Sequence, residues 1–158
     1  MLERARQKLE KELLALEREF RHELPKEIHR ALQMGDLREN AEYQSALERQ
    51  HFVKSRITQL QEQLKNLAMI DLNALPKDRA GLGSTVTVLD VESGKTLVYE
   101  LTIPEESDFG KGLVSITSPI GKALVGCRKG DDLTIKIPAG QRVYEVKKVV
   151  TLHDKEPR

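Results

Sequence analysis

The spacing of apolar residues changes once along this chain of 158 residues, at about Pro76. Before Pro76, apolar side chains recur every three, four or seven residues, which is the period of one face of an α-helix. After Pro76 they alternate with polar side chains, as in a β-strand with one buried face. The two periods predict an α+β protein with a helical part at residues 1–75 and a small sheet domain at residues 76–158.

Two apolar stripes make up the helical part. The first comprises Leu2, Leu9, Leu13, Leu16, Phe20, Leu24, Ile28 and Leu32. The second comprises Leu47, Val53, Ile57, Leu60, Leu64 and Leu67. Two helices of similar length with a short connection pack antiparallel, so we predict a coiled-coil hairpin with arms of about 45 Å. Pro25 lacks an amide proton and therefore kinks the first arm or marks a local break in it.

The segment Gly-Asp-Leu-Arg-Glu-Asn-Ala-Glu-Tyr at residues 35–43 places three carboxylates at the hairpin tip. Asp36 and Glu39 have the spacing of a capping box at a helix start. A capping carboxylate still has lone pairs for a cation, and magnesium often takes one or two protein carboxylates while water and phosphate complete its shell. The pair therefore fits a helix cap, a magnesium site shared with another molecule, or both. Tyr43 fits a partner contact and packing between the arms equally well.

The sheet domain contains five strand candidates, at residues 84–90, 96–101, 113–117, 133–137 and 143–150. Turn residues at 92–95 and 138–141 indicate hairpins, and residues 120–127 suit a short helix on one face of an antiparallel sheet. Ser118, Asp131 and Asp132 have no histidine nearby in the sequence, and we expect His153 to lie in a fraying tail. This part of the chain therefore fits binding better than catalysis.

Charge and cysteine content narrow the class of protein. The chain carries 26 Lys and Arg against 25 Asp and Glu. It therefore lacks the excess of positive charge with which proteins bind the phosphates of a nucleic-acid duplex. Cys127 is the only cysteine, so no intrachain disulfide forms, which fits a reducing compartment. No apolar run approaches membrane-spanning length. We therefore expect a cytoplasmic protein without a membrane partner.

These motifs together resemble the Gre family of bacterial transcript cleavage factors, and its GreA branch more than its GreB branch. The resemblance covers nearly the whole chain. It rests on residues 35–43, on Ser-Pro-Ile-Gly-Lys-Ala-Leu-Val-Gly at 118–126 and on Tyr-Glu-Val at 144–146. It implies a coiled coil that enters the secondary channel of RNA polymerase and an FKBP-like sheet domain that docks at the channel rim.

The resemblance also implies roles for particular residues. The family's acidic pair falls on Asp36 and Glu39, flanked by Asn40, Glu42 and Tyr43 as tip support. The implied activity is stimulation of the polymerase's own magnesium-dependent cleavage of backtracked RNA, so the chain is not itself an enzyme and needs no cofactor beyond the magnesium in the polymerase active site. We expect a monomer whose partners are RNA polymerase and the 3′ end of the nascent RNA. The expected docking residues are Ser118, Pro119, Ile120, Gly121 and Lys122.

Three alternatives remain open at this point. The first arm is a few residues shorter between Pro25 and Gly35 than we expect for the family, and one lost turn removes about 5 Å of reach. The shorter reach argues for a Gre-like regulator that occupies the channel without promoting cleavage, whereas the intact pair of Asp36 and Glu39 argues for an active factor. A peptidyl-prolyl isomerase would need more aromatic residues than the Tyr99, Phe109 and Tyr144 of the sheet domain. A plain coiled-coil oligomeriser is the third alternative.

Overall fold

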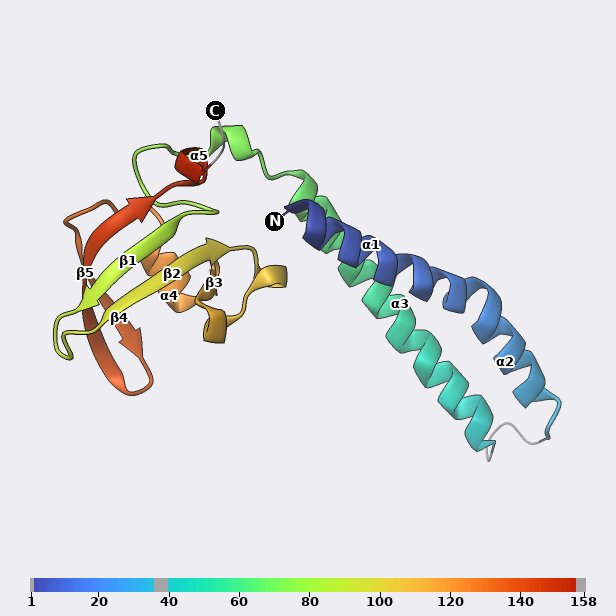
Figure 1. The fold of residues 1–158 in the computed structure, drawn as a ribbon. Helices are drawn as coiled ribbons and strands as arrows, with labels where there is room; N and C mark the ends of the chain where they lie inside the picture. Colours follow the sequence, from blue (N-terminus) through green and yellow to red (C-terminus); the bar gives the residue numbers. More distant parts are fainter. Residues whose placement is uncertain (1, 36–39, 156–158) are drawn as a thin grey trace. The chain divides into compact units, whose positions relative to one another are not determined.

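The computed structural model describes residues 2–35 and 40–155, which form two compact units (Figure 1). Leu2–Ile70 is helical, and the chain from Asp71 onward contains a five-stranded sheet. This confirms the α+β class. Within the described ranges, no helix has the length and apolar character needed to cross a membrane.

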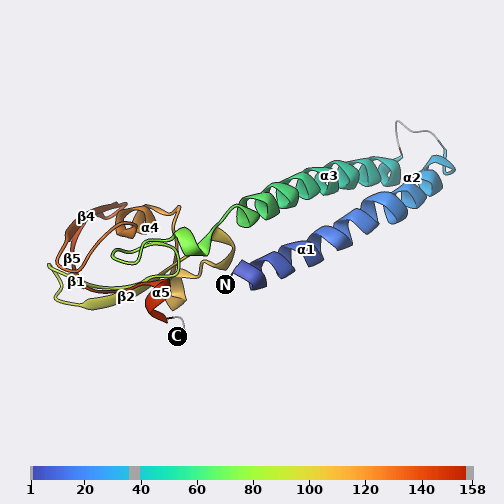
Figure 2. The same cartoon turned by 90° about the horizontal axis from the view of Figure 1, so that it is seen from above.

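The helical unit is the predicted antiparallel hairpin. Its first arm consists of α1 (Leu2–Arg18), a π-helical turn (Glu19–Glu23) and α2 (Leu24–Leu32), and its second arm is α3 (Ala41–Ala68). Both views show α1 and α2 lying alongside α3 (Figures 1 and 2). The buried residues of α3 follow one another at steps of seven, as in a coiled coil: Ala46, Val53, Leu60 and Leu67.

The π-helical turn shifts the phase of the first arm by one residue. The Leu24 amide donates to the Glu19 carbonyl, five residues earlier, so the turn contains one residue more than an α-helical turn. It lies just before Pro25, whose ring cannot donate the next helical hydrogen bond, so the local break expected at Pro25 is confirmed. The inward positions Leu9, Leu16, Leu24 and Ala31 are consequently spaced by seven, eight and seven residues.

This shift corrects one part of the predicted stripe. Ala31 is buried, whereas Leu32 is 42% exposed. The prediction placed Leu32 inward by continuing the steps of four residues from Phe20 through Leu24 and Ile28. With the eight-residue step across the π-helical turn, the inward positions of α2 fall instead at Leu24 and Ala31, and Leu32 lies off this face.

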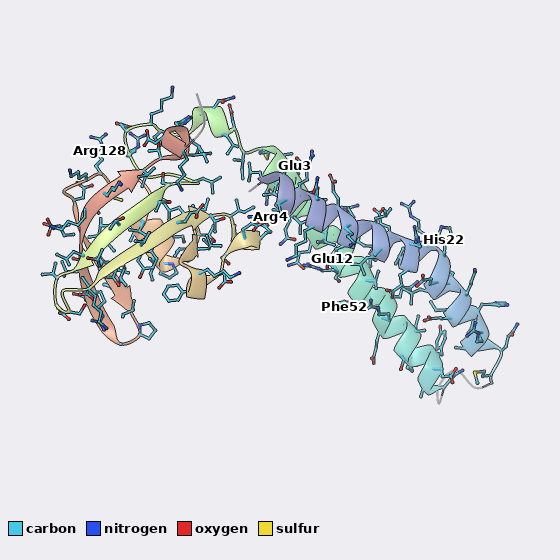
Figure 3. All side chains as sticks on the ribbon, in the orientation of Figure 1. Glu3, Arg4, Glu12, His22, Phe52 and Arg128 are labelled. Atoms are coloured by element: carbon cyan, nitrogen blue, oxygen red, sulfur yellow. The ribbon has the colours of Figure 1, made fainter. Side chains whose placement is uncertain are left out.

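Two bidentate ion pairs join the arms. Arg56 donates to both carboxylate oxygens of Glu12, at 2.8 and 3.0 Å, and Arg49 donates to both of Glu19, at 2.6 and 2.8 Å. Figure 3 shows Glu12 on the side of α1 that faces α3. The two pairs are seven residues apart on each arm, so they repeat with the coiled-coil period and favour a single register.

The sheet contains β1 (Thr85–Asp90), β2 (Thr96–Thr102), β3 (Leu113–Ser115), β4 (Asp132–Ile137) and β5 (Gly140–Val150), in the order β3-β2-β1-β5-β4. The predicted strands and both predicted hairpins are present. The expectation of a wholly antiparallel sheet is wrong at one edge, because β3 runs parallel to β2. The connection between them includes two 3₁₀ turns, Pro104–Glu106 and Phe109–Lys111, and is long enough to bring the chain back in the same direction.

One core lies between the sheet and α4 (Pro119–Leu124), the predicted short helix, which packs beside β3 and β4. Its central residues come from alternate positions of neighbouring strands and include Val86, Val88, Leu101, Ile135 and Val146. After β5 the chain forms α5 (Leu152–Lys155). The expected fraying at His153 is wrong, because its Nε2 lies 2.9 Å from the Leu75 carbonyl oxygen and the Thr151 amide donates to Asp154.

Candidate functional site

The second arm of the hairpin starts from an asparagine cap. The Asn40 Oδ1 accepts a hydrogen bond from the Tyr43 amide at 3.1 Å, and α3 begins at the next residue, Ala41. The capping box expected for Asp36 and Glu39 therefore does not start α3. Asparagine caps a helix as well as aspartate does, and it directly precedes the first helical residue.

Asn40 also contacts the other arm. Its Nδ2 donates to the Ala31 carbonyl oxygen at 2.5 Å, across nine residues of sequence. Ala31 lies in the last turn of α2, where carbonyl groups lack a partner further along the helix. Sequence reasoning placed Asn40 only as tip support, and no local pattern signals this bond because its acceptor is a backbone atom of the opposite arm.

The remaining residues of the predicted tip divide into two groups. Asp36 and Glu39, expected as catalytic acids and magnesium ligands, lie outside the described residues. Glu42 and Tyr43 occupy the first turn of α3, where Glu42 is exposed and Tyr43 is half-buried. A carboxylate in this turn is stabilised by the helix dipole. In the part of the chain that the structure describes, no group of three His, Cys, Asp or Glu is arranged to hold a metal ion.

A groove of about 520 Å³ separates α2 from α3 near the tip. It is lined by Glu27, Arg30, Ala41, Glu42, Ser45, Ala46 and Arg49. Ala31 and Ala46 are the fully buried apolar residues closest to the tip, while Ile28, Tyr43 and Leu47 are half-buried. Apolar burial is therefore less complete at this end than at Val53 and Leu60 further along α3.

The predicted docking residues lie around the start of α4. The Ser118 hydroxyl accepts from the Gly121 amide at 3.0 Å and donates to the Ser115 carbonyl at 2.6 Å, so it caps α4 and joins it to β3. Ser118, Pro119 and Ile120 line a second groove, of about 240 Å³ and mainly apolar. Gly121 is buried against β3, and Lys122 is exposed but does not line this groove.

Sequence reasoning missed the other residues of this groove. They are Phe109, Val114, Lys136, Ile137 and Pro138. The Phe109 side chain is 66% exposed, and its ring centroid lies 6.2 Å from that of Tyr99. An exposed large aromatic beside an apolar groove marks a candidate contact surface. These residues come from segments far apart in the sequence, so only the fold brings them together.

The fold and these two sites define a class of protein: a helical hairpin with a capped tip in the same chain as a sheet domain that carries an apolar groove. Comparison with known families gives two adjacent matches. Residues 1–69 match the family described as transcription elongation factor, N-terminal, and residues 75–151 match transcription elongation factor, GreA/GreB, C-term. The chain belongs to the GreA/GreB family of transcription elongation factors, which confirms the resemblance inferred from its motifs.

Two GreA relatives agree with this assignment. The chain is 41% identical to transcription elongation factor GreA of a Nitratiruptor species over 143 residues, covering 90% of this chain and 87% of the relative. It is 40% identical to GreA of Rhodospirillum rubrum over 139 residues, covering 88% of each. Among solved structures, GreA factor homolog 1 (Gfh1) of Thermus thermophilus is 28% identical, with 94% of each chain covered and a TM-score of 0.43.

Proposed function

We propose that this chain stimulates the RNA polymerase's own magnesium-dependent cleavage of backtracked nascent RNA and so restarts arrested elongation complexes. The observation that carries the proposal is the acidic segment 35–43, which joins the two arms of the hairpin in a chain that belongs to the GreA/GreB family across both units. The chain acts on RNA only through the polymerase and is not an enzyme by itself.

The tip carboxylates supply oxygen atoms to the polymerase active site. Asp36 is our choice for a magnesium ligand, and Glu39 for a second ligand or for the group that orients the attacking water. Hard cations that keep part of their water shell are often completed by one or two carboxylates in this way. When bound there, magnesium would supply activation of the attacking water and stabilisation of the charge that develops during in-line displacement at phosphorus. The polymerase provides the other ligands and the substrate, so the chain carries no cofactor of its own.

The sheet unit provides the docking surface. Pro119, Ile120 and Phe109 present apolar surface at the groove beside α4, with Lys136 among its lining residues. A partner segment with an apolar anchor suits this groove, since buried anchors supply most of the affinity of protein interfaces. The chain works as a monomer in the cytoplasm, with RNA polymerase and the 3′ end of the nascent RNA as its partners.

The test is RNA cleavage in stalled, backtracked complexes with polymerase alone, with the protein, and with its Asp36→Asn or Glu39→Gln variant. We expect the wild type to stimulate cleavage. In each variant the stimulated rate falls at least about tenfold, which corresponds to about 1.4 kcal/mol of transition-state stabilisation. Binding and melting temperature stay unchanged, because Asn40 supplies the cap of α3. Glu62→Gln, at an exposed position of α3, is the matched control and keeps the full rate.

Two results would contradict the proposal. Wild-type protein that binds polymerase without stimulating cleavage would assign the chain to the regulators that occupy the channel. Full stimulation by both acid variants would show that neither carboxylate contributes to the reaction.

A further inference from the structure

We propose that Asn40 is a positioning residue that sets the geometry of the hairpin tip by joining the last turn of α2 to the first turn of α3. The inference rests on the proposed function, because it assigns the effect of Asn40 to cleavage chemistry at the tip. It goes beyond helix capping, since a cap needs only an acceptor.

The side chain of Asn40 uses both of its polar atoms. Its Oδ1 accepts from the Tyr43 amide at 3.1 Å within α3, while its Nδ2 donates to the Ala31 carbonyl at 2.5 Å on α2. Its own carbonyl accepts the first helical bond of α3, from the Gln44 amide at 3.1 Å. A side-chain amide carries a donor and an acceptor on separate atoms, whereas a carboxylate only accepts. Aspartate could therefore cap α3 but could not make the bond to Ala31.

The bond links Ala31 and Asn40, nine residues apart in the sequence, through one side chain. The Ala31 carbonyl oxygen also accepts a hydrogen bond from the Met34 amide at 3.1 Å. Asn40 therefore binds the same oxygen atom that the backbone just after α2 binds. Ala31 is 2% exposed and Asn40 is half-buried. A hydrogen bond shielded from water in this way is stronger than one at an open surface.

The apolar side chains of Ile28, Tyr43 and Leu47 are only half-buried at this end, so polar contacts between the arms matter more here than further along the hairpin. The groove of about 520 Å³ lies between α2 and α3, and among the described residues the inter-arm ion pair nearest the tip is Glu19 with Arg49. Arg49 is nine residues along α3 from Asn40, or about 13 Å at 1.5 Å per residue. The bond from Asn40 to Ala31 is therefore the inter-arm contact closest to the tip among the hydrogen bonds and ion pairs of the described residues.

A carboxylate that must reach a metal in another molecule is sensitive to small displacements, and a misplacement of about 1 Å can cost about a hundredfold in rate. Loss of the Asn40 bond lets the ends of α2 and α3 move relative to each other. The maximal cleavage rate then falls. A higher magnesium concentration is needed to reach half of that maximal rate. The affinity for polymerase does not change, because the docking surface lies in the other unit.

Asn40→Ser and Asn40→Asp test this, because both residues cap helices about as well as asparagine but lack the amide donor. We expect the rate at saturating protein to fall roughly ten- to a hundredfold, with a higher magnesium requirement and unchanged binding. The melting temperature falls only by the small amount that the loss of one hydrogen bond causes. The matched controls are Asn66→Ser and Asn66→Asp, which make the same changes at an exposed position of α3 and keep the full rate. Full activity with normal magnesium dependence in both Asn40 variants would overturn the inference, and so would a rate loss that merely follows lost helix stability.

A second measurement does not depend on cleavage. Spin labels at Leu32→Cys and Ser45→Cys, both at exposed positions, report the distance between the arms in the full chain. Cys127 stays unlabelled, because it is 3% exposed and burial raises its pKa to about 11. We expect Asn40→Ser to broaden the distance distribution, and an unchanged distribution would overturn the inference. If the wild type fails to stimulate cleavage, the proposed function fails while this distance still tests the bond.

Discussion

Gly121 occupies a position in α4 where no side chain fits. A Cβ atom there would lie 1.8 Å from the carbonyl oxygen of Ser115, far inside van der Waals contact. The backbone of α4 thus packs directly on the end of β3, and the Ser118 hydroxyl joins the same carbonyl to the helix start. The absence of a side chain at Gly121 allows the two backbones to approach closely. Pro119 and Ile120 beside it line the groove.

We predict that Gly121→Ala lowers the free energy of unfolding by about 1–3 kcal/mol, as overpacking does. Alanine gains up to about 1 kcal/mol in helix propensity, which is too little to offset the displacement of β3. Chemical denaturation measures the change. Lys122→Ala, one residue further on the exposed side of α4, stays within about 0.5 kcal/mol. An unchanged unfolding midpoint for Gly121→Ala would contradict the close packing of the α4 backbone on Ser115 of β3.

The two arms of the hairpin are joined by ion pairs whose strength depends on pH. Hydrogen bonding to Arg56 lowers the pKa of Glu12, and hydrogen bonding to Arg49 lowers the pKa of Glu19, each from its ordinary value. A carboxyl whose pKa is lower in the folded state stabilises the fold above its unfolded pKa, and this stabilisation is lost as the pH falls through its folded pKa. Both pairs are partly exposed, so each contributes at most about 1 kcal/mol.

We therefore predict that the helical unit loses stability as the pH is lowered from about 6 to about 3, through and below the ordinary pKa of glutamate near 4.3. Helical circular dichroism during thermal unfolding measures this. A Glu12→Gln, Glu19→Gln double variant starts less stable and loses less over the same range. Glu48→Gln with Glu62→Gln, both exposed on α3, is the charge-matched control. Identical pH profiles for the double variant and wild type would show that the pairs contribute nothing.

The whole molecule consists of two units with separate cores. The sheet unit buries its apolar side chains within residues 80–146, and the helical unit buries its own heptad stripe. The two family matches, at residues 1–69 and 75–151, follow the same division. A unit with its own core folds independently of the rest of the chain.

We predict that residues 71–158 alone fold cooperatively and keep the amide spectrum that they show in the full chain, as measured by nuclear magnetic resonance. On the proposed function, this fragment competes with the full chain for polymerase but does not stimulate cleavage. Phe109→Glu in the fragment weakens competition without unfolding it, because the Phe109 side chain lines the groove and is 66% exposed. An unfolded fragment would contradict the independence of the unit, whereas a folded fragment that does not compete would contradict the docking surface.

The fold class and the order of the elements could be predicted from the residues alone. Helical spacing before Pro76 and alternation after it predicted the hairpin, the strands and the short helix, and the motif at residues 35–43 indicated the family. These features depend only on residues close together in the sequence, because the period of apolar residues indicates which face of a helix or strand is buried. The acid pair of the candidate site also came from the sequence, and its role stays a prediction.

Features that depend on residues far apart in the chain became known only from the folded structure. Three features cannot be predicted from a local period: the parallel direction of β3, the π-helical turn that sets Ala31 on the inward face, and the position of Phe109 and Ile120 at one groove. The bond from Asn40 to Ala31 belongs with them. Each depends on how two segments approach in space, and that is set by packing across the whole unit rather than by the spacing of residues within one segment.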